Sequence, residues 1–265
     1  MRLRFELAAV IVLSGMIVPS VDAHEFWIDG NVHGADGESV LELDLKVGQM
    51  LDGVSLPFVP DTVETFDWIW GGAGPVKGAI GDVPAAVVPF DPQRGAVIFH
   101  RTKPRRLVHK DWDEFLSYLK MEGLEHAEDE HLARGLPLTG FSESYSRHAK
   151  LVVLPKDSPA IEDHYQGSPV EIVLDQVILD REHTRIIGRI FQDVTVRPSQ
   201  VTVFQSKPDG LEVRKVEISK DGRFDVAVPE SGSVLLNAVA LSSASPVDAE
   251  WHSDWASVLI KFDQS

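Results

Sequence analysis

The stretch Val40-Leu41-Glu42-Leu43-Asp44-Leu45-Lys46-Val47 decides the class of fold, because apolar and charged residues alternate through it almost strictly. Alternation with a period of two places the apolar side chains on one face of a β-strand and the charged ones on the other. Gly48 follows and predicts the end of this strand. Upstream, residues 25–28 predict a short strand, and residues 29–31 (Asp-Gly-Asn) predict a turn. The beginning of the chain therefore indicates a β-rich fold.

The chain beyond residue 169 continues the β pattern with regular spacing. Apolar stretches alternate with turn signals such as Pro208-Asp209-Gly210 and Lys220-Asp221-Gly222. They predict strands near residues 170–174, 185–191, 200–205, 213–219, 224–228, 234–241 and 255–262. This density of short strands is typical of an antiparallel β-sandwich.

Residues 111–135 interrupt the β pattern with a helical one. Four apolar residues lie at helical spacing: Trp112, Phe115, Leu116 and Leu119. Asp111 or Asp113 can cap the start of this helix, and Gly123 predicts its end. Residues 125–134 are highly charged and predict a second, solvent-exposed helix.

Residues 1–23 have the pattern of a secretory signal peptide. Arg2 and Arg4 precede an apolar run over residues 7–18, and Val21 and Ala23 are small enough for the cleavage site. The run is shorter than the roughly 20 residues that a helix needs to cross a bilayer. Cleavage after Ala23 would make His24 the first residue. Its α-amine and imidazole could then chelate one transition-metal ion; alternatively, His24 only opens the first strand.

Processing would leave 242 of the 265 residues, enough for one large domain or two of ordinary size. Residues 155–169 are polar and rich in proline and glycine, which is typical of a linker. We therefore expect a signal peptide over residues 1–23 and an N-terminal β-rich domain over residues 24–155, with the helical insertion near residues 111–135. A β-sandwich domain would follow over residues 156–265.

The formal net charge of the chain is −16 at neutral pH. An acidic surface repels phosphate backbones, so we expect no nucleic-acid partner. The chain has no cysteine, which excludes disulfides and thiolate metal sites. The mature chain has no further apolar stretch long enough to span a membrane. Together with the signal peptide, these features predict a periplasmic location.

Four short motifs occur in order along the chain. They are Ala23-His24-Glu25-Phe26-Trp27-Ile28, the helical segment 115–124 ending in Glu122-Gly123-Leu124, Tyr145-Ser146-Arg147-His148-Ala149-Lys150, and Trp251-His252-Ser253-Asp254-Trp255-Ala256-Ser257. In these motifs the chain resembles a large group of bacterial periplasmic proteins of unknown function, some of them described as periplasmic components of nickel or cobalt uptake. The resemblance implies a mainly β protein with a C-terminal immunoglobulin-like β-sandwich and a role with a divalent metal.

In one position the chain departs from this family. Members often carry a histidine in the strand near residues 237–241, where this chain has Ala238 and Ala240. If that histidine is a metal ligand in the other members, the site is altered or missing in this chain.

A metal site needs at least one ligand beyond the two nitrogens of His24. The candidates are His252, His148, His100 and His109. His252 comes first because it lies in the terminal motif, and His148 lies in the preceding one. Each also has a simpler interpretation: His148 as a hydrogen-bonded residue at the start of a strand, and His252 as a solvent-exposed loop residue. The predicted metal ligands are therefore His24, His252 and His148, and nitrogen ligands of this kind suit nickel, cobalt, copper or zinc.

Other conspicuous residues have structural interpretations. Trp251 and Trp255 are large and apolar, so we expect them to fill the core or the seam between the domains. Arg147 and Lys150 lie in a chain rich in carboxylates, and we expect them to form structural ion pairs.

The sequence thus predicts an exported protein that binds nickel or cobalt through its processed N-terminal histidine and supports metal uptake. An uptake transporter in the inner membrane would be its partner. The chain has no nucleophile elbow, no phosphate-binding glycine loop and no His-Glu-x-x-His motif, so we expect no enzymatic activity. Two alternatives stay open: a copper oxygenase with an N-terminal histidine brace, and an adhesive or structural β-sandwich module that binds no metal.

Overall fold

The computed structural model describes residues 25–34, 39–69, 73–156, 158–179, 184–192, 198–207, 210–228, 232–244 and 249–262. The expected signal peptide and His24 lie outside the described residues. Within the described part the chain is mainly β, with two α-helices.

The strands, in chain order, are β1 (Glu25–His33), β2 (Val40–Gln49), β3 (Asp52–Leu56), β4 (Val63–Ile69), β5 (Ala73–Pro75), β6 (Ala86–Pro89), β7 (Ala96–Thr102), β8 (Arg105–His109), β9 (Phe141–Val153), β10 (Val170–Leu179), β11 (Thr184–Gln192), β12 (Gln200–Lys207), β13 (Gly210–Glu217), β14 (Arg223–Val228), β15 (Ser233–Ser243) and β16 (Trp251–Lys261). The helices are α1 (Trp112–Glu122) and α2 (His126–Ala133), and a single 3-10 turn, η1 (Pro60–Thr62), precedes β4 in this part of the chain.

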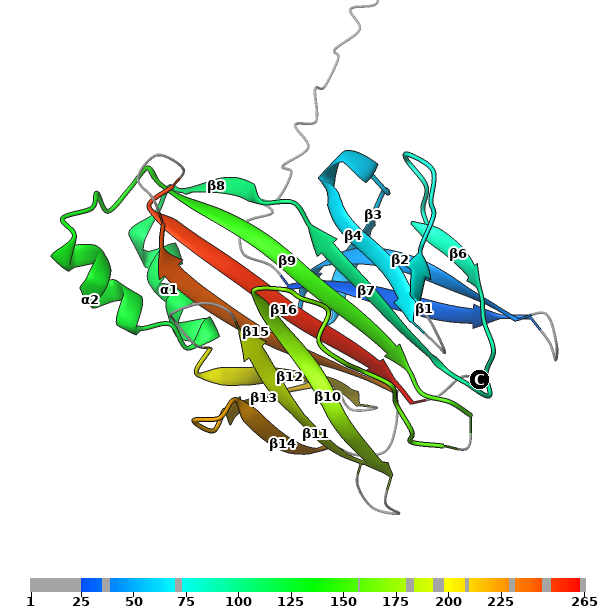
Figure 1. The fold of residues 1–265 in the computed structure, drawn as a ribbon. Helices are drawn as coiled ribbons and strands as arrows, with labels where there is room; N and C mark the ends of the chain where they lie inside the picture. Colours follow the sequence, from blue (N-terminus) through cyan, green and yellow to red (C-terminus); the bar gives the residue numbers. More distant parts are fainter. Residues whose placement is uncertain are drawn as a thin grey trace, which may run out of the picture.

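The described strands form three sheets (Figure 1). The largest, called the central sheet below, has nine strands in the described ranges, in the order β13-β12-β15-β16-β9-β7-β4-β5, with β8 also paired to β9. Its long middle strands, β9 and β16, are parallel and in register from Glu143 opposite Trp251 to Val153 opposite Lys261. The second sheet joins β1, β2 and β3, with β6 on β2, and the third is β10-β11-β14.

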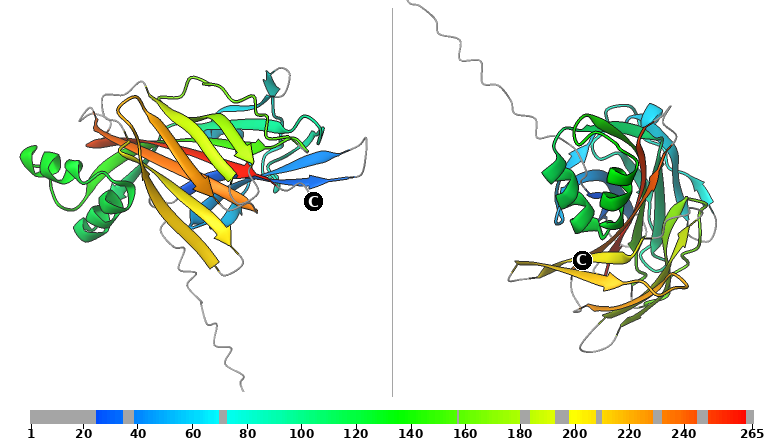
Figure 2. Two further views of the ribbon diagram at one scale, coloured as in Figure 1. Left: turned by 90° about the horizontal axis from the view of Figure 1, so that it is seen from below. Right: turned by 90° about the vertical axis from the view of Figure 1, so that its left-hand side faces the viewer.

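The central sheet lies between two covering layers. Its side chains alternate between its two faces, and each face is buried under one of these layers. On one face, Leu151 and Leu259 pack against the β1-β2-β3 sheet. On the opposite face, Val152 and Val258 pack against the β10-β11-β14 sheet. The helices α1 and α2 gather at one end of the molecule (Figures 1 and 2). There they cover the first face over an aromatic cluster that includes Trp251.

The structure confirms the expected fold class, a mainly β chain with a short helical insertion and a β-sandwich. In β2, Leu41, Leu43, Leu45 and Val47 are buried and the charged residues between them are half-buried, as the alternation predicted. The side chain of Asp111 caps α1 by accepting a hydrogen bond from the Glu114 amide at 2.9 Å. Gly123 ends α1 in the left-handed conformation, at φ 72°.

The predicted turn at residues 29–31 is wrong, because β1 continues to His33. Long-range contacts replace the turn. A Cβ atom on Gly30 would lie 2.5 Å from a side-chain carbon of Leu151, so the absence of a side chain lets β1 cross β9 closely. The Asp29 carboxylate pairs with Lys46 of β2 at 3.0 Å and with Lys261 of β16 at 2.7 Å. These two lysines balance the charge of Asp29, so that it can lie within β1.

The second helix also differs from the expectation, because His131 of α2 is fully buried. Its Nδ1 accepts a hydrogen bond from the indole of Trp251 at 3.1 Å, and its Nε2 donates to the carbonyl of Pro137 at 3.0 Å. Trp251 and Trp255 are both buried, as predicted. No helix in the described ranges is long and apolar enough to cross a membrane.

Candidate functional site

The start of β1 is held in the interior of the molecule. Glu25, Phe26, Trp27 and Ile28 are all buried. The carbonyl of Phe26 accepts a hydrogen bond from the hydroxyl of Ser257 in β16 at 2.6 Å. The strand therefore begins at a fixed place against the central sheet.

Glu25 brings a carboxyl group into this interior. The residue is only 3% exposed, and its Oε2 atom has no hydrogen-bond partner. Burial raises the pKa of the Glu25 carboxyl, because the charged form loses its hydration, although a hydrogen bond with its own backbone opposes the change. A buried carboxylate is costly, and the raised pKa favours the neutral, protonated form of Glu25.

Glu122, the last residue of α1, faces the same region. It is 5% exposed, and the side-chain amide of Asn237 donates a hydrogen bond to its Oε2 at 3.2 Å. The pKa of the Glu122 carboxyl is raised to about 8, mainly by burial and in addition by the negative charge of Glu25. The charge of Lys215 and the hydrogen bond from Asn237 oppose this rise.

The amphipathic pattern of α1 explains how Glu122 comes to be buried. Phe115, Tyr118, Leu119 and Glu122 form the buried stripe of the helix, at the i, i+3, i+4 and i+7 positions. Three of them are hydrophobic, and the fourth is an acid at a position where an apolar residue is expected. Sequence reasoning directed at histidines missed this signal.

Tyr118 adds a hydroxyl group to the same surroundings. Its ring stacks on Trp255 of β16 with the centroids 5.7 Å apart. The residue is 7% exposed, and its hydroxyl group lies near Ser253 and Glu143, whose hydrogen bonds influence its pKa. Burial raises the pKa of Tyr118 well above its ordinary value, and the charges of Glu143 and Glu122 add to this.

Three of the four sequence motifs meet at the start of β1, and the second packs against the fourth. Ser257 of the fourth motif donates a hydrogen bond to the carbonyl of Phe26, and Tyr118 of the second motif stacks on Trp255 of the fourth. Glu122 of the second motif lies where the charge of Glu25 influences its pKa. The guanidinium of Arg147 lies over the rings of Phe26 and Tyr145, 5.7 Å and 5.0 Å from their centres. Segments far apart in the chain therefore build one site, which we call the β1 site.

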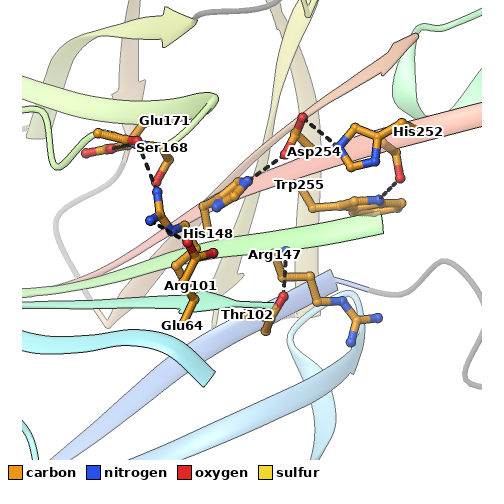
Figure 3. A network of polar contacts seen from close by, with 12 residues as sticks. Glu64, Arg101, Thr102, Arg147, His148, Ser168, Glu171, His252, Asp254 and Trp255 are labelled. Atoms are coloured by element: carbon orange, nitrogen blue, oxygen red, sulfur yellow. Dashed lines mark hydrogen bonds and ion pairs between the residues drawn. The ribbon is translucent and has the colours of Figure 1, made fainter. Parts of the chain in front are cut away.

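Two of the predicted metal ligands, His148 and His252, come together elsewhere. Figure 3 shows Asp254 between them, with Nε2 of His148 2.8 Å from Oδ1 and Nε2 of His252 3.2 Å from Oδ2. His148 and Asp254 are almost fully buried, whereas the side chain of His252 is 31% exposed. Burial opposes ionisation of Asp254, but hydrogen bonds from His148 and His252 outweigh it and lower its pKa to about 2. The hydrogen bond between His252 and Asp254 raises the pKa of the His252 imidazole.

This histidine pair and the β1 site lie on opposite faces of the central sheet. In β16, Ala256 and Val258 pack against the β10-β11-β14 sheet, and regular alternation places His252 and Asp254 on that face. Ser257 lies between Ala256 and Val258, so its side chain is on the other face, where it contacts β1. The structure thus brings His148 and His252 to each other but not to Glu25.

The other candidate histidines have separate surroundings. His100 is fully buried between the rings of Phe26 and Phe66, with both ring nitrogens unpartnered. Burial lowers its pKa to about 3, so the ring stays neutral. His109 lies 2.8 Å from Oε2 of Glu143 and packs under α1 against Phe115.

Within the described part of the chain, no group of three or more histidine, aspartate or glutamate side chains is arranged to hold a metal ion. The β1 site contributes only two such groups from this part, Glu25 and Glu122. His24, bonded to Glu25, lies outside it. No family model matches the sequence, and comparison with curated proteins and with solved structures finds no significant match.

Proposed function

We propose that the chain is an exported periplasmic protein that binds a divalent transition metal, nickel or cobalt, through its processed N-terminal His24. It would support metal uptake by delivering the ion to a transporter in the inner membrane. Copper and zinc are chemically compatible with the same nitrogen donors.

The contacts that fix the start of β1, between Phe26 and Arg147 and between Phe26 and Ser257, are the observation that supports this proposal. His24 is joined by one peptide bond to Glu25, which pairs with Gly48 of β2, and the next residue, Phe26, is hydrogen-bonded to Ser257 of β16. A chelate formed by the α-amine and imidazole of His24 would therefore be attached to a rigid element. A fixed attachment reduces the ordering that binding requires and favours affinity.

The chemistry of the site also favours a cation. The reference pKa values of an α-amine (about 7.7–8.0) and of imidazole (about 6.5) let a metal displace their protons near neutral pH at modest cost. Burial raises the pKa of the Glu25 and Glu122 carboxyls and so favours their neutral forms, while the charge of Lys215 opposes the rise at Glu122. A divalent cation held by His24 would favour the charged form of a neighbouring carboxyl.

The test is a metal titration of protein released from a fusion so that His24 is its first residue. Nickel chloride and cobalt chloride are titrated calorimetrically into this form, into His24→Ala, and into a chain that retains Ala23. We expect one ion per chain and at least about tenfold weaker binding in the two altered forms, because each loses a nitrogen donor.

His126→Ala, a change at an exposed histidine of α2, is the matched control and should bind like the unaltered chain. Equal affinities in the unaltered, His24→Ala and extended forms would contradict the proposal.

A further inference from the structure

We propose that the outer edge of β8 binds an extended acidic segment of another protein, which adds one strand to the central sheet. Three features of residues 103–109 support this assignment: an open strand position, backbone groups directed into it, and a local excess of positive charge. None of these residues belongs to the metal site proposed above, so the two proposals can be tested independently.

The first feature is a strand position beside β8 that no described strand occupies. β7 and β8 pair in succession with one side of β9, whose other side pairs with β16. The outer side of β7 pairs with β4, which begins at Val63 opposite Thr102, and the amide of Lys103 donates a hydrogen bond to the carbonyl of Thr62 at 2.9 Å. β8 begins at Arg105, and within the described ranges it pairs with β9 alone, at the margin of the central sheet (Figure 1). The position that β4 occupies beside β7 is therefore open beside β8.

The second feature is the direction of the backbone groups in β8. The carbonyl of His109 accepts a hydrogen bond at 2.7 Å from the amide of Gly140, the residue before β9, so the backbone of His109 is directed toward β9. Along an antiparallel strand these groups point alternately to one side and to the other. Leu107 is therefore also directed toward β9, whereas Arg106 and Val108 direct their N–H and C=O groups into the open position. Backbone groups at such an edge can pair with an added strand.

The third feature is the charge of this edge. Residues 92–110 include no aspartate or glutamate, whereas the chain as a whole has a net charge of −16. Lys103, Arg105 and Arg106 are all exposed, and none of them forms an ion pair with a described residue. Arg106 is partly balanced, because it donates a hydrogen bond to the hydroxyl of Ser142 at 2.8 Å and its charge acts on Glu250. The edge as a whole therefore attracts negative charge.

Two other outer strands, β13 and β14, carry balanced charges instead. In β13, Glu212 pairs with Lys207 and lies 3.6 Å from Arg214. In β14, Asp225 pairs with Arg185 of β11. Charges of either sign can keep an edge from pairing with another chain. Among these three edges, however, the edge of β8 alone would attract an acidic segment.

These features define the chemistry of the partner. Strand addition to a sheet edge takes its affinity from main-chain hydrogen bonds and its selectivity from side chains that alternate between two faces. Arg105 and Arg106 point to opposite faces, so an acid on either face of the added strand would meet a cation. Val108, which is 43% exposed, offers an apolar contact on the same face as Arg106. The partner segment should therefore be extended and should combine acidic with apolar residues.

The probe is a fluorescein-labelled peptide of four Glu-Val repeats, titrated with the protein at low salt and followed by fluorescence anisotropy. A peptide of four Lys-Val repeats reverses the charge, and a peptide of four Glu-Pro repeats keeps the acids but removes every second backbone N–H. We expect the Glu-Val peptide to bind and the other two to bind at least about tenfold more weakly, because each lacks one of the two contributions. Binding should weaken as salt screens the charges.

Two pairs of variants locate the binding on β8. Arg105→Glu combined with Arg106→Glu should weaken binding of the Glu-Val peptide at least about tenfold. Lys77→Glu combined with Lys156→Glu, at exposed lysines outside β8, changes the net charge equally and should leave the affinity within about twofold. Val108→Pro removes an N–H that is directed into the open position, so the fold should tolerate the change and binding should fall. Val108→Ala keeps this N–H and should bind like the unaltered protein.

Thermal unfolding checks that each variant is folded; if Val108→Pro is not, the comparison of the Glu-Val and Glu-Pro peptides decides whether backbone pairing contributes. Equal binding of those two peptides, or of Val108→Pro and Val108→Ala, would overturn the added strand, because charge alone would then explain the affinity. No binding of the Glu-Val peptide, or equal losses in the two charge-reversed variants, would show that this edge does not select an acidic partner. Binding to phosphatidylglycerol vesicles without binding to the peptide would identify a membrane surface instead and would also overturn the proposal.

Discussion

At the scale of the residue, Glu122 is an acid that folding removes from water and brings near a second acid, Glu25. Its pKa rises from 4.5 in the unfolded chain to about 8 in the folded protein. Between these values the unfolded chain releases the proton and the folded protein keeps it. The free energy of unfolding of the metal-free protein should therefore fall as the pH rises from 4.5 to 8. At about 1.4 kcal/mol per pKa unit, the loss is on the order of 3–5 kcal/mol.

Urea unfolding with a chelator present, at several pH values between 5 and 9, measures this dependence. Glu122→Gln cannot ionise, so its stability should exceed that of the unaltered chain by a margin that grows with pH. Glu114→Gln should follow the unaltered chain, since Glu114 is exposed. Parallel curves for Glu122→Gln and the unaltered chain would contradict the assignment of the raised pKa.

The residues of the β1 site were only partly predictable from the sequence. The His24-Glu25 junction stands out because the sequence predicts a signal peptide before it, but nothing local indicates that Glu25 is buried. Glu122 could have been found as the one acid in the apolar stripe of α1, yet its meeting with Asn237 depends on residues 115 positions apart. His131 was expected on a solvated helix because its neighbours are charged. Its burial depends on Trp251, 120 positions away.

At the scale of the element, a buried ion triad fastens the segment before β10 to the central sheet. Nζ of Lys150 in β9 lies 2.7 Å from a carboxylate oxygen of Asp163 and 2.7 Å from one of Glu171, and all three side chains are at most 2% exposed. Asp163 also accepts a hydrogen bond from the Leu174 amide at 2.8 Å. The polar stretch expected to be a linker is therefore tied to β9.

Lys150→Met should destabilise the protein by about 3–5 kcal/mol, because it leaves two buried carboxylates without their cation. Urea unfolding at neutral pH measures the loss. Lys103→Met, at an exposed lysine in the turn before β8, should change the stability by less than about 0.5 kcal/mol. A loss of less than about 1 kcal/mol for Lys150→Met would show that the triad adds little to the fold.

Elements with local signals were predicted well, and elements fixed by distant contacts were not. The strands after residue 169 lie near their predicted positions because apolar runs mark them, although β10 continues to Leu179 and β16 begins earlier, at Trp251. The end of α1 agrees because Gly123 adopts the left-handed conformation that favours glycine. The predicted turn at residues 29–31 is wrong because Gly30 lies within β1, where it allows the strand to pass close to Leu151. A glycine in a turn and a glycine at a close contact between strands look the same in the sequence.

At the scale of the whole molecule, the central sheet joins the two halves of the chain. The expected boundary between residues 155 and 156 separates β9 from β16 in sequence, yet these strands pair in parallel along eleven positions. The apolar clusters on both faces of the sheet also combine residues from the two halves. Because the two halves of the chain share these apolar clusters, we expect the stability of each half to depend on the other.

The separate fragment of residues 156–265 should therefore fail to fold. Without β9, one edge of β16 would lose its hydrogen bonds, and Val258 and Ile260 would lose Val152 as a partner in their core. We expect the fragment to give a poorly dispersed amide NMR spectrum and no cooperative thermal transition. In the whole chain, by contrast, the amides of β9 and β15 should exchange with solvent at the same opening free energy, because both become exposed only when the whole protein unfolds. A well-dispersed spectrum from the fragment would establish two independent domains, and the parallel pairing of β9 with β16 would then be a docking contact between them.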